Sequence, residues 1–182
     1  MHDRTVLKTV FLLALASAVP ACSDEPQAEA PRETIGNETL AAAMAGSDNV
    51  SAMSKAMQQT GLAQVFDGSA AYTVLAPSND ALAELEQQQA LTNEEHRALL
   101  AAVLREHVLP GALTPEDIEN AIEVQGGTVS IQTMGDGIMR FAMDDQRLTV
   151  TDQNGRTATI SGAPILASNG VVIPIDGVLK QP

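Results

Sequence analysis

Cysteine is almost absent from this chain of 182 residues, which contains Cys22 and no other. A single cysteine excludes an internal disulfide framework, so the fold must be held together by its hydrophobic core. With one cysteine and three histidines, the sequence also lacks the ligand set of a zinc site, and it has no glycine-rich phosphate loop. We therefore expect neither a metal nor a cofactor.

Aromatic residues are scarce as well, at 2% of the chain, and tryptophan is missing. Protein interfaces usually draw on aromatic anchors, and sugar-binding faces stack sugars on aromatic rings. The shortage argues against a broad carbohydrate platform. Any surface that binds a partner must instead be aliphatic, methionine-based or polar.

Basic residues are outnumbered by acidic ones, 10 against 23, and the formal net charge is −13 at pH 7. A strongly acidic chain repels phosphate backbones and anionic lipid surfaces. We therefore predict that the protein does not bind nucleic acid. Acidity also keeps an exported domain soluble, so the charge says little more about function.

The apolar run over residues 10–19 is too short to cross a bilayer as a helix. It follows Arg4 and Lys8, and it leads into residues 19–22 (VPAC), which resemble a bacterial lipobox. This order is typical of a lipoprotein signal peptide. We expect a signal peptide over residues 1–21 and lipidation of Cys22. The alternative is an ordinary secretory signal that is cut near Ala21 and leaves Cys22 free.

Residues 22–34 are expected to form the lipidated cysteine and a disordered tether. Ser23–Thr34 is polar and acidic, and its twelve residues reach at most about 40 Å. Residues 1–21 carry one net positive charge, so cleavage would change the net charge from −13 to −14. We expect a lipid anchor in the bacterial cell envelope, facing the periplasm or the outer surface. Ser23 favours the outer membrane, and a soluble periplasmic or secreted protein is the alternative.

Residues 35–182 are predicted to form one domain whose first half is mainly helical. Apolar residues recur at helical spacing over residues 38–62, 92–108 and 114–121. Met53 and Met57, one turn apart, are interpreted as core residues. A strand over Tyr72–Leu75 should end at Pro77. Ser78 or Asn79 can then cap the helix that follows.

After Val124 the apolar period changes from 3.6 to 2, which predicts strands over 129–133, 138–143, 148–151, 158–160 and 171–179. Helices in the first half and strands in the second favour an α+β fold. Proline is tolerated in sheets at edges, strand starts or bulges. Pro174 therefore predicts that the last strand is interrupted there or lies at a sheet edge.

Two stretches resemble the signature boxes of the fasciclin-like domain family: residues 72–82 (YTVLAPSNDAL) and 168–179 (SNGVVIPIDGVL). Residues 106–111 (EHVLPG) resemble a third family stretch between them. The resemblance implies a β-sandwich or wedge flanked by helices, over residues 35–182. It also implies cell adhesion or surface and periplasmic protein contacts rather than catalysis, with a protein or an envelope or matrix component as partner. The matching motif residues are Thr73, Pro77, Asn79, Asp80, His107, Asn169, Gly170 and Asp176.

The chain departs from the family pattern at three places. Glu106 stands where the family often has a tyrosine in a stretch linked to adhesion, and Ile173-Pro174 stands where it often has a histidine. Pro164-Ile165 replaces an Asp–Ile motif with which some animal members contact integrins. Because proline has no carboxylate to coordinate an integrin's metal, animal-type integrin contact is not supported.

Two other functional classes stay open at this point. A small apolar-ligand or lipid-binding module would use a cleft between helices and sheet. A serine hydrolase would use Ser78 and His107, but Ser78 lacks the small flanking residues of a nucleophile elbow, and a helix cap fits it better. Two acidic stretches, Asp144-Asp145 and residues 152–155, are interpreted as β-turns because neither has the spacing of an EF-hand loop. We assign no catalytic residue.

Overall fold

The computed structural model describes residues 36–89 and 96–180. The expected signal peptide, the lipidated cysteine, the tether and residues 92–95 at the start of the helix predicted over 92–108 lie outside these ranges. Within them, no helix combines the length and the apolar character needed to cross a membrane.

The chain begins with two short helices on one side of the domain. Helix α1 (Leu40–Ala45) is capped by the Thr39 side chain, a short 3-10 turn η1 (Asp48–Val50) follows, and α2 (Ser51–Thr60) ends at a left-handed glycine, Gly61. The predicted helix over 38–62 is therefore broken between α1 and α2, where the Gly46 N–H donates back to the Ala42 carbonyl. The apolar spacing continues across the break because both helices bury their apolar faces in one core.

In the middle of the chain, helices and strands are interspersed. These elements are η2 (Leu62–Asp67), β1 (Tyr72–Pro77), α3 (Asn79–Gln89), α4 (Arg97–Glu106) and β2 (Val108–Pro110). The predicted helix over 92–108 is wrong at its end, because Val108 starts a strand instead. The strand form lets β2 pair with β1, with Val108 opposite Val74. Local apolar periodicity cannot predict this long-range pairing.

The second half begins with α5 (Pro115–Gln125), which Thr114 and Asp117 open with a reciprocal capping box. Hydrogen bonds from the Thr114 backbone and side chain lower the pKa of Asp117. The helix runs one turn beyond its predicted end at residue 121, to a left-handed glycine at position 126. The strands that follow are β3 (Thr128–Gln132), β4 (Ile138–Asp144), β5 (Arg147–Thr151), β6 (Thr157–Thr159), β7 (Ile165–Ala167) and β8 (Gly170–Ile175).

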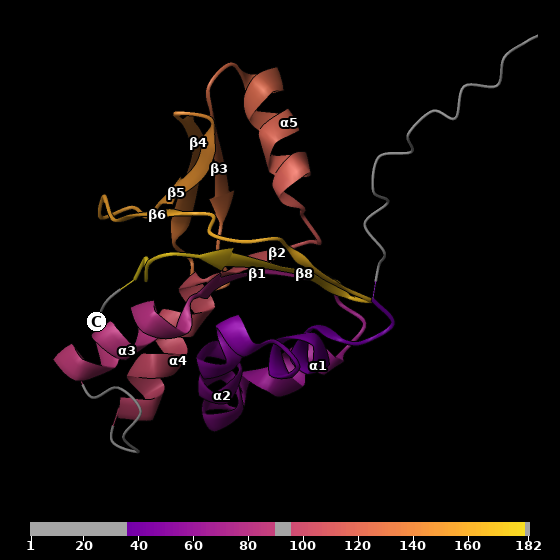
Figure 1. The fold of residues 1–182 in the computed structure, drawn as a ribbon, viewed down its shortest axis with the longest axis vertical. Helices are drawn as coiled ribbons and strands as arrows, with labels where there is room; N and C mark the ends of the chain where they lie inside the picture. Colours follow the sequence, from indigo (N-terminus) through magenta and orange to yellow (C-terminus); the bar gives the residue numbers. More distant parts are fainter. Residues whose placement is uncertain (1–35, 90–95, 181–182) are drawn as a thin grey trace, which may run out of the picture. The chain divides into compact units, whose positions relative to one another are not determined.

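The strands form two four-stranded sheets, with orders β2-β1-β8-β7 and β3-β4-β5-β6 (Figure 1). In the first sheet β1 and β8 run parallel, in a register from Tyr72 opposite Gly170 to Pro77 opposite Ile175. The second sheet is an antiparallel meander. The predicted α+β fold, with helices first and strands later, is confirmed.

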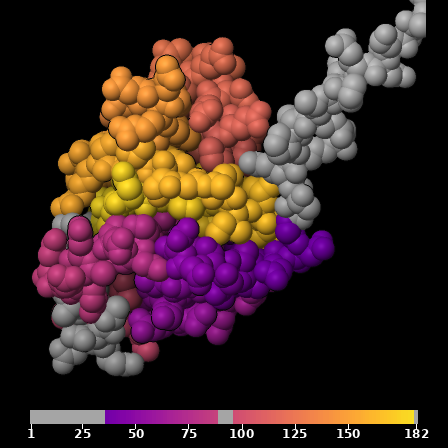
Figure 2. All heavy atoms as spheres, in the orientation of Figure 1, coloured from indigo at the N-terminus to yellow at the C-terminus, as the bar shows by residue number. Residues whose placement is uncertain are grey.

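The sheet containing β1 and β8 has a hydrophobic core on each face. Val74 and Val172 face the core made with α1, α2 and α4, whereas Leu75, Val171 and Ile173 face the core made with α5 and the second sheet. Alternate residues of one strand therefore stabilise different layers, as the pleat requires. Figure 2 shows the late strands (yellow) between the early helices (indigo and magenta) and the second sheet (orange).

The expectation that Pro174 interrupts the last strand is wrong, whereas the expectation of a sheet edge holds locally, at this residue. Strand β8 runs unbroken through Pro174, and β8 lies between β1 and β7. Strand β7 pairs no further along β8 than Val172, and the Pro174 carbonyl accepts a hydrogen bond from the Ser161 N–H on that side. The nitrogen of a strand residue points to the same side as its carbonyl, so the missing N–H of Pro174 faces away from β1. Proline is tolerated because the neighbouring strand has already ended there.

Candidate functional site

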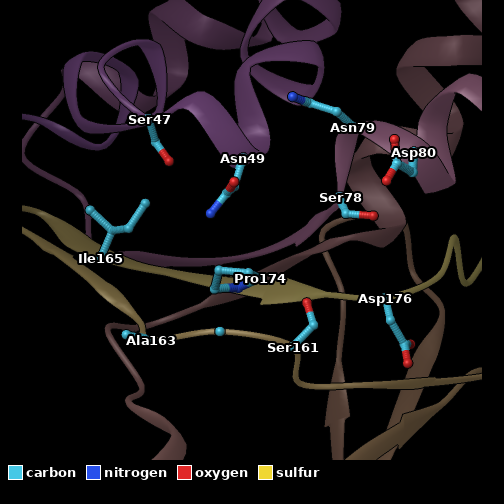
Figure 3. Close-up of a pocket in the computed structure, with 11 residues that line it drawn as sticks. Ser47, Asn49, Ser78, Asn79, Asp80, Ser161, Ala163, Ile165, Pro174 and Asp176 are labelled. Carbon is cyan, nitrogen blue, oxygen red and sulfur yellow. The ribbon is translucent and has the colours of Figure 1, made fainter.

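The two motif stretches lie side by side, and their ends contribute to a surface cleft of about 600 Å³. We call it the polar cleft (Figure 3). It lies where the parallel strands β1 and β8 end, a position at which α/β sheets commonly bind ligands. The residues that line it are Ser47, Asn49, Ser78, Asn79, Asp80, Ser161, Gly162, Ala163, Ile165, Pro174 and Asp176.

Ser78 joins the end of β1 to the start of α3. Its N–H donates to the Ile175 carbonyl at 2.9 Å, and its Oγ accepts from the Ala81 N–H at 3.3 Å. The Ser78 side chain therefore caps α3, as the sequence predicted. Buried Pro77 directly before it is the last residue of β1 and pairs with Ile175.

The Asn79 side chain makes structural hydrogen bonds to the backbone at the start of α2. Its Oδ1 accepts from the Ala52 N–H at 2.9 Å, and its Nδ2 donates to the Asp48 carbonyl at 2.6 Å. These contacts satisfy the first turn of α2 from outside that helix. Asp80 next to it is exposed in the first turn of α3, where a negative charge is favoured by the helix dipole.

Asp176 follows β8 at the far side of the polar cleft. Its Oδ1 accepts from the Thr159 N–H at 2.7 Å, and its own N–H donates to the Thr159 carbonyl at 3.0 Å. The carboxylate thus extends the ladder between β8 and the end of β6. The three motif residues in the cleft differ in consequence: Asn79 and Asp176 hold backbone in place, and Asp80 faces solvent.

Three further motif residues lie at the opposite end of the β1–β8 pair. Buried Thr73 uses its hydroxyl to donate to the Gly111 carbonyl and to accept from the Leu113 N–H at 2.7 Å. The Asn169 side chain makes hydrogen bonds to three backbone groups: its Oδ1 accepts from the Leu40 N–H, and its Nδ2 donates to the carbonyls of Phe66 and Gly68. These side chains fix loops rather than forming part of the polar cleft.

Gly170 comes next and has a φ of 154°. A Cβ at this position would collide with the Tyr72 carbonyl oxygen and lie 2.6 Å from Leu40 Cδ1. The close approach of β8 to β1 therefore requires glycine there. The motif pattern Asn–Gly at 169–170 encodes one tight, hydrogen-bonded strand start.

His107 is buried, and both of its ring nitrogens contact backbone groups. The Leu179 N–H donates to Nε2 at 3.1 Å, so Nδ1 carries the proton and donates to the Val103 carbonyl at 2.9 Å. Burial lowers the pKa of His107 to about 4, against the opposite effects of the Val103 carbonyl and the Asp152 charge. The Nε2 lone pair of His107 is already occupied by the Leu179 N–H and the Ser78 side chain caps α3, so neither group is arranged as a base and a nucleophile.

Glu106 replaces the tyrosine of the family pattern, and the structure gives it a local partner. Its Oε2 accepts from the Thr133 hydroxyl at 2.7 Å. A Cβ on Gly135 or Gly137 would collide with the Glu106 side chain. The carboxylate thus fills a space that two glycines of the β3–β4 turn leave open, and it is almost fully buried.

The acidic stretches form turns, as expected. Both side-chain oxygens of Asp152 are engaged inside its own loop: Oδ1 accepts from the Asn154 and Arg156 N–H groups, and Oδ2 accepts from the Asn154 side chain. Asp145 has a positive φ in the turn between β4 and β5. Among residues 36–89 and 96–180, no group of three or more histidine, cysteine, aspartate or glutamate residues could hold a metal ion.

Sequence reasoning missed most of the cleft. Ser47 and Asn49 come from the loop between α1 and α2, and Ser161 comes from the loop before β7. Figure 3 shows Ser47 and Asn49 on one side of the cleft, opposite Pro174 and Ser161. No local pattern singles out these polar loop residues, because they meet through the pairing of distant segments.

Comparison with known proteins identifies the family to which this chain is similar. The model of the fasciclin domain matches residues 48–182. Protein sll1483 of Synechocystis is 30% identical over 146 residues, which cover 79% of this chain and 74% of that protein. Transforming growth factor-beta-induced protein ig-h3 of Sus scrofa is 27% identical over 147 residues, which cover 79% of this chain but 19% of that protein.

A solved structure supports the same conclusion at the level of the fold. It is a FAS1 domain pair from the insect cell adhesion molecule Fasciclin I, and it aligns with a TM-score of 0.60 at 22% identity. The alignment covers 72% of this chain and 45% of that one. The two sheets, the helices before them and the matched length agree: the chain belongs to the fasciclin domain family.

Proposed function

We propose that this protein is a non-enzymatic fasciclin domain that is anchored in the bacterial envelope and binds protein or matrix partners, as an adhesion or surface-contact module. One observation carries the proposal. The motif side chains that could have served chemistry instead make structural hydrogen bonds: Asn79 and Asp176 to backbone N–H groups, and His107 to two backbone groups. What the motifs build is a rigid scaffold beneath an open surface.

The relatives support the adhesion part of the proposal. The insect structure with the same fold comes from a cell adhesion molecule. This chain spans 45% of that structure and 19% of the porcine protein ig-h3, so the contacts made by whole proteins of that kind are a proposal for this one. The integrin route is left aside because Pro164 offers no carboxylate.

Crosslinking in the native envelope tests the contact role. A photo-crosslinking amino acid at Ser161 in the polar cleft should capture a protein or matrix partner. The same group at Ser130, an exposed residue of β3 that does not line the cleft, is the matched control. Equal capture from both positions, or none from either, would contradict a specific contact at the cleft.

The anchor has a test of its own. If Cys22 is lipidated, Cys22→Ser should release the protein from membranes into the soluble periplasmic or secreted fraction. Fractionation followed by immunoblotting measures this, and separating inner from outer membranes tests the location that Ser23 favours. Continued membrane retention of the variant would rule out an anchor at Cys22.

A small apolar ligand is the second candidate, and one observation favours it. An apolar hollow of about 200 Å³ lies among α2, α3 and α4. It is not the cleft between helices and sheet that the sequence suggested. Native mass spectrometry of the purified chain tests this candidate, since a stoichiometric small molecule that co-purifies would support it.

The serine hydrolase alternative can be tested directly by covalent labelling. A fluorophosphonate probe labels serines that are activated by a base, whereas the Ser78 hydroxyl caps α3 and both ring nitrogens of His107 contact backbone groups. We expect no labelling that Ser78→Ala would abolish.

A further inference from the structure

We infer that the apolar hollow among α2, α3 and α4 seats one large apolar side chain of a partner protein, in a segment whose neighbouring residues are basic. This inference rests on the proposed contact function and specifies the chemistry of the partner.

The hollow exists because small side chains face larger ones between three helices. Ala52 and Ala56 come from α2, Leu82, Ala83 and Leu85 come from α3, and Leu100 comes from α4. Alanine side chains are too short to fill the space between helices, and the surrounding leucines give it an apolar wall. The sequence therefore leaves an opening where close packing is the rule in protein interiors.

Its size selects the occupant. A dry cavity of about 150 Å³ is enough to bind benzene, whereas drug-sized ligands occupy pockets of about 300–1,000 Å³. At about 200 Å³, the hollow suits one leucine, phenylalanine or similar side chain rather than a cofactor or a lipid chain. Such an anchor in a pocket is the usual source of binding energy in an interface.

The composition of the chain points the same way. The described domain has three aromatic residues, Phe66, Tyr72 and Phe141, and both phenylalanines are fully buried. A surface that lacks aromatic anchors of its own can still bind by offering the pocket instead. The anchor then comes from the partner.

The charge around the hollow selects the residues that flank the anchor in the partner. Asn79 lines both the hollow and the polar cleft, so the two form one surface. Asp80 and Asp176 line the cleft, and among the described residues that line the cleft or the hollow, none is basic. Acidic surroundings favour a cationic segment and repel an acidic one. A chain with a net charge of −13 is a poor partner for itself on the same grounds.

The rim between hollow and cleft is held in place before binding. The Asn79 side chain bonds to the Ala52 N–H and the Asp48 carbonyl, which ties α3 to the start of α2. A preformed pocket loses less conformational entropy on binding than one that must be ordered.

Peptide titration of the full chain carrying Cys22→Ser tests the inference. The probes are capped peptides KKFKK, KKAKK and EEFEE, followed by amide chemical shifts in NMR. KKFKK should perturb amides of α2 and α3 around the hollow, with a Kd of about 1 mM. KKAKK and EEFEE should each bind at least about tenfold more weakly, because one lacks the anchor and the other has the wrong charge.

Two pairs of variants localise the effect. Ala83→Leu fills the hollow from an exposed position on α3, and it should weaken KKFKK binding at least about tenfold. Ala42→Leu, at an exposed position on α1 that does not line the hollow, is the matched control and should leave binding unchanged. Asp80→Asn should weaken binding about two- to threefold, whereas Glu84→Gln, exposed on α3 outside both linings, should not.

The outcomes separate this inference from the function it rests on. Equal binding of KKFKK to Ala83→Leu, equal binding of EEFEE, or a co-purified small molecule in the hollow would overturn the inference. None of these affects capture of a partner at Ser161, which tests the contact role independently. If crosslinking fails while KKFKK binds as described, the proposed envelope contact fails and the chemistry of the hollow stands.

Discussion

At the scale of single residues, the motif side chains act mainly as hydrogen-bond partners for backbone groups that are distant in sequence. Asn169 satisfies groups more than a hundred residues away, and His107 reaches Leu179. Among the described residues, every buried side-chain nitrogen and oxygen atom has a hydrogen-bond partner. Losing one partner leaves a buried donor or acceptor without compensation, so these positions should be sensitive to small chemical changes.

The first prediction concerns His107 and pH. Its pKa is lowered from 6.5 to about 4 by burial. Between these two pH values, the unfolded chain therefore binds a proton that the folded chain does not. The stabilising contribution is fully present above pH 6.5 and is lost as the pH falls towards 4. It amounts to about 3 kcal/mol. Urea unfolding at several pH values between 7 and 4 measures it.

Variants isolate the contribution of His107 from that of the carboxylates. His107→Gln should remove the part of the pH dependence that lies between pH 6.5 and 4, whatever it does to the stability at pH 7. His96→Gln is the control and should keep that dependence. An unchanged slope in His107→Gln would show that His107 titrates normally in the folded protein.

The second prediction concerns Asn169. In Asn169→Asp a carboxylate oxygen would replace the amide that donates to the carbonyls of Phe66 and Gly68, both at 2.7 Å. Two acceptors would then face a buried charge, so we expect the free energy of unfolding to fall by about 3 kcal/mol or more. Asn120→Asp, exposed on α5, should change it by less than about 0.5 kcal/mol. Chemical denaturation measures both.

At the scale of elements, the parallel pair of β1 and β8 organises the domain. The two strands bring the signature stretches together, and the loops after them form the polar cleft. Their close approach begins at Gly170, whose neighbours leave no space for a side chain. The pairing of these strands is therefore the element-level feature on which the cleft depends.

The third prediction tests that approach. Gly170→Ala should lower the free energy of unfolding by about 3 kcal/mol or more, because the new Cβ meets both the Tyr72 carbonyl and Leu40. Gly155→Ala is the matched control: its φ of 84° is also left-handed, but nothing lies within 4 Å of its Cβ. Strain alone should cost about 1 kcal/mol there. Equal losses in the two variants would contradict a steric role for Gly170.

At the scale of the whole domain, two hydrophobic cores share one sheet. Val172 contributes to the core with the helices, while its neighbours Val171 and Ile173 contribute to the core with α5 and the second sheet. Neither core can lose this sheet without exposing the other. The domain should therefore unfold as one cooperative unit, although its contacts divide into two clusters.

The fourth prediction follows from this shared sheet. Far-UV circular dichroism and the fluorescence of Tyr72, the single tyrosine of the chain, should give coincident urea transitions. Amide exchange at Phe141 in β4 and at Val74 in β1 should report the same global free energy. Separate transitions, or weaker protection throughout β3–β6, would mean that the second sheet and α5 unfold on their own.

Part of this structure could be predicted from local sequence. The strands of the second half, the cap at Ser78, the helix that begins after Thr114 and the burial of Met53 and Met57 all follow from periodicity and short-range hydrogen bonding. These features depend on residues close together in the sequence, and the folded structure contains them. The end of α4, the short strand β2 and the unbroken course of β8 through Pro174 were not predictable, because partners far along the chain decide them.

The class of fold and the family follow from the sequence, because alternating apolar residues decide which faces are buried and the two marker stretches carry the family resemblance. What those marker stretches do becomes visible only in the folded domain. Ser47, Ser78 and Ser161 become one cleft through strand pairing, and three alanines from two helices become one hollow through helix packing. Such surfaces are made from residues that share no local pattern, so the chain reveals them only when it is folded.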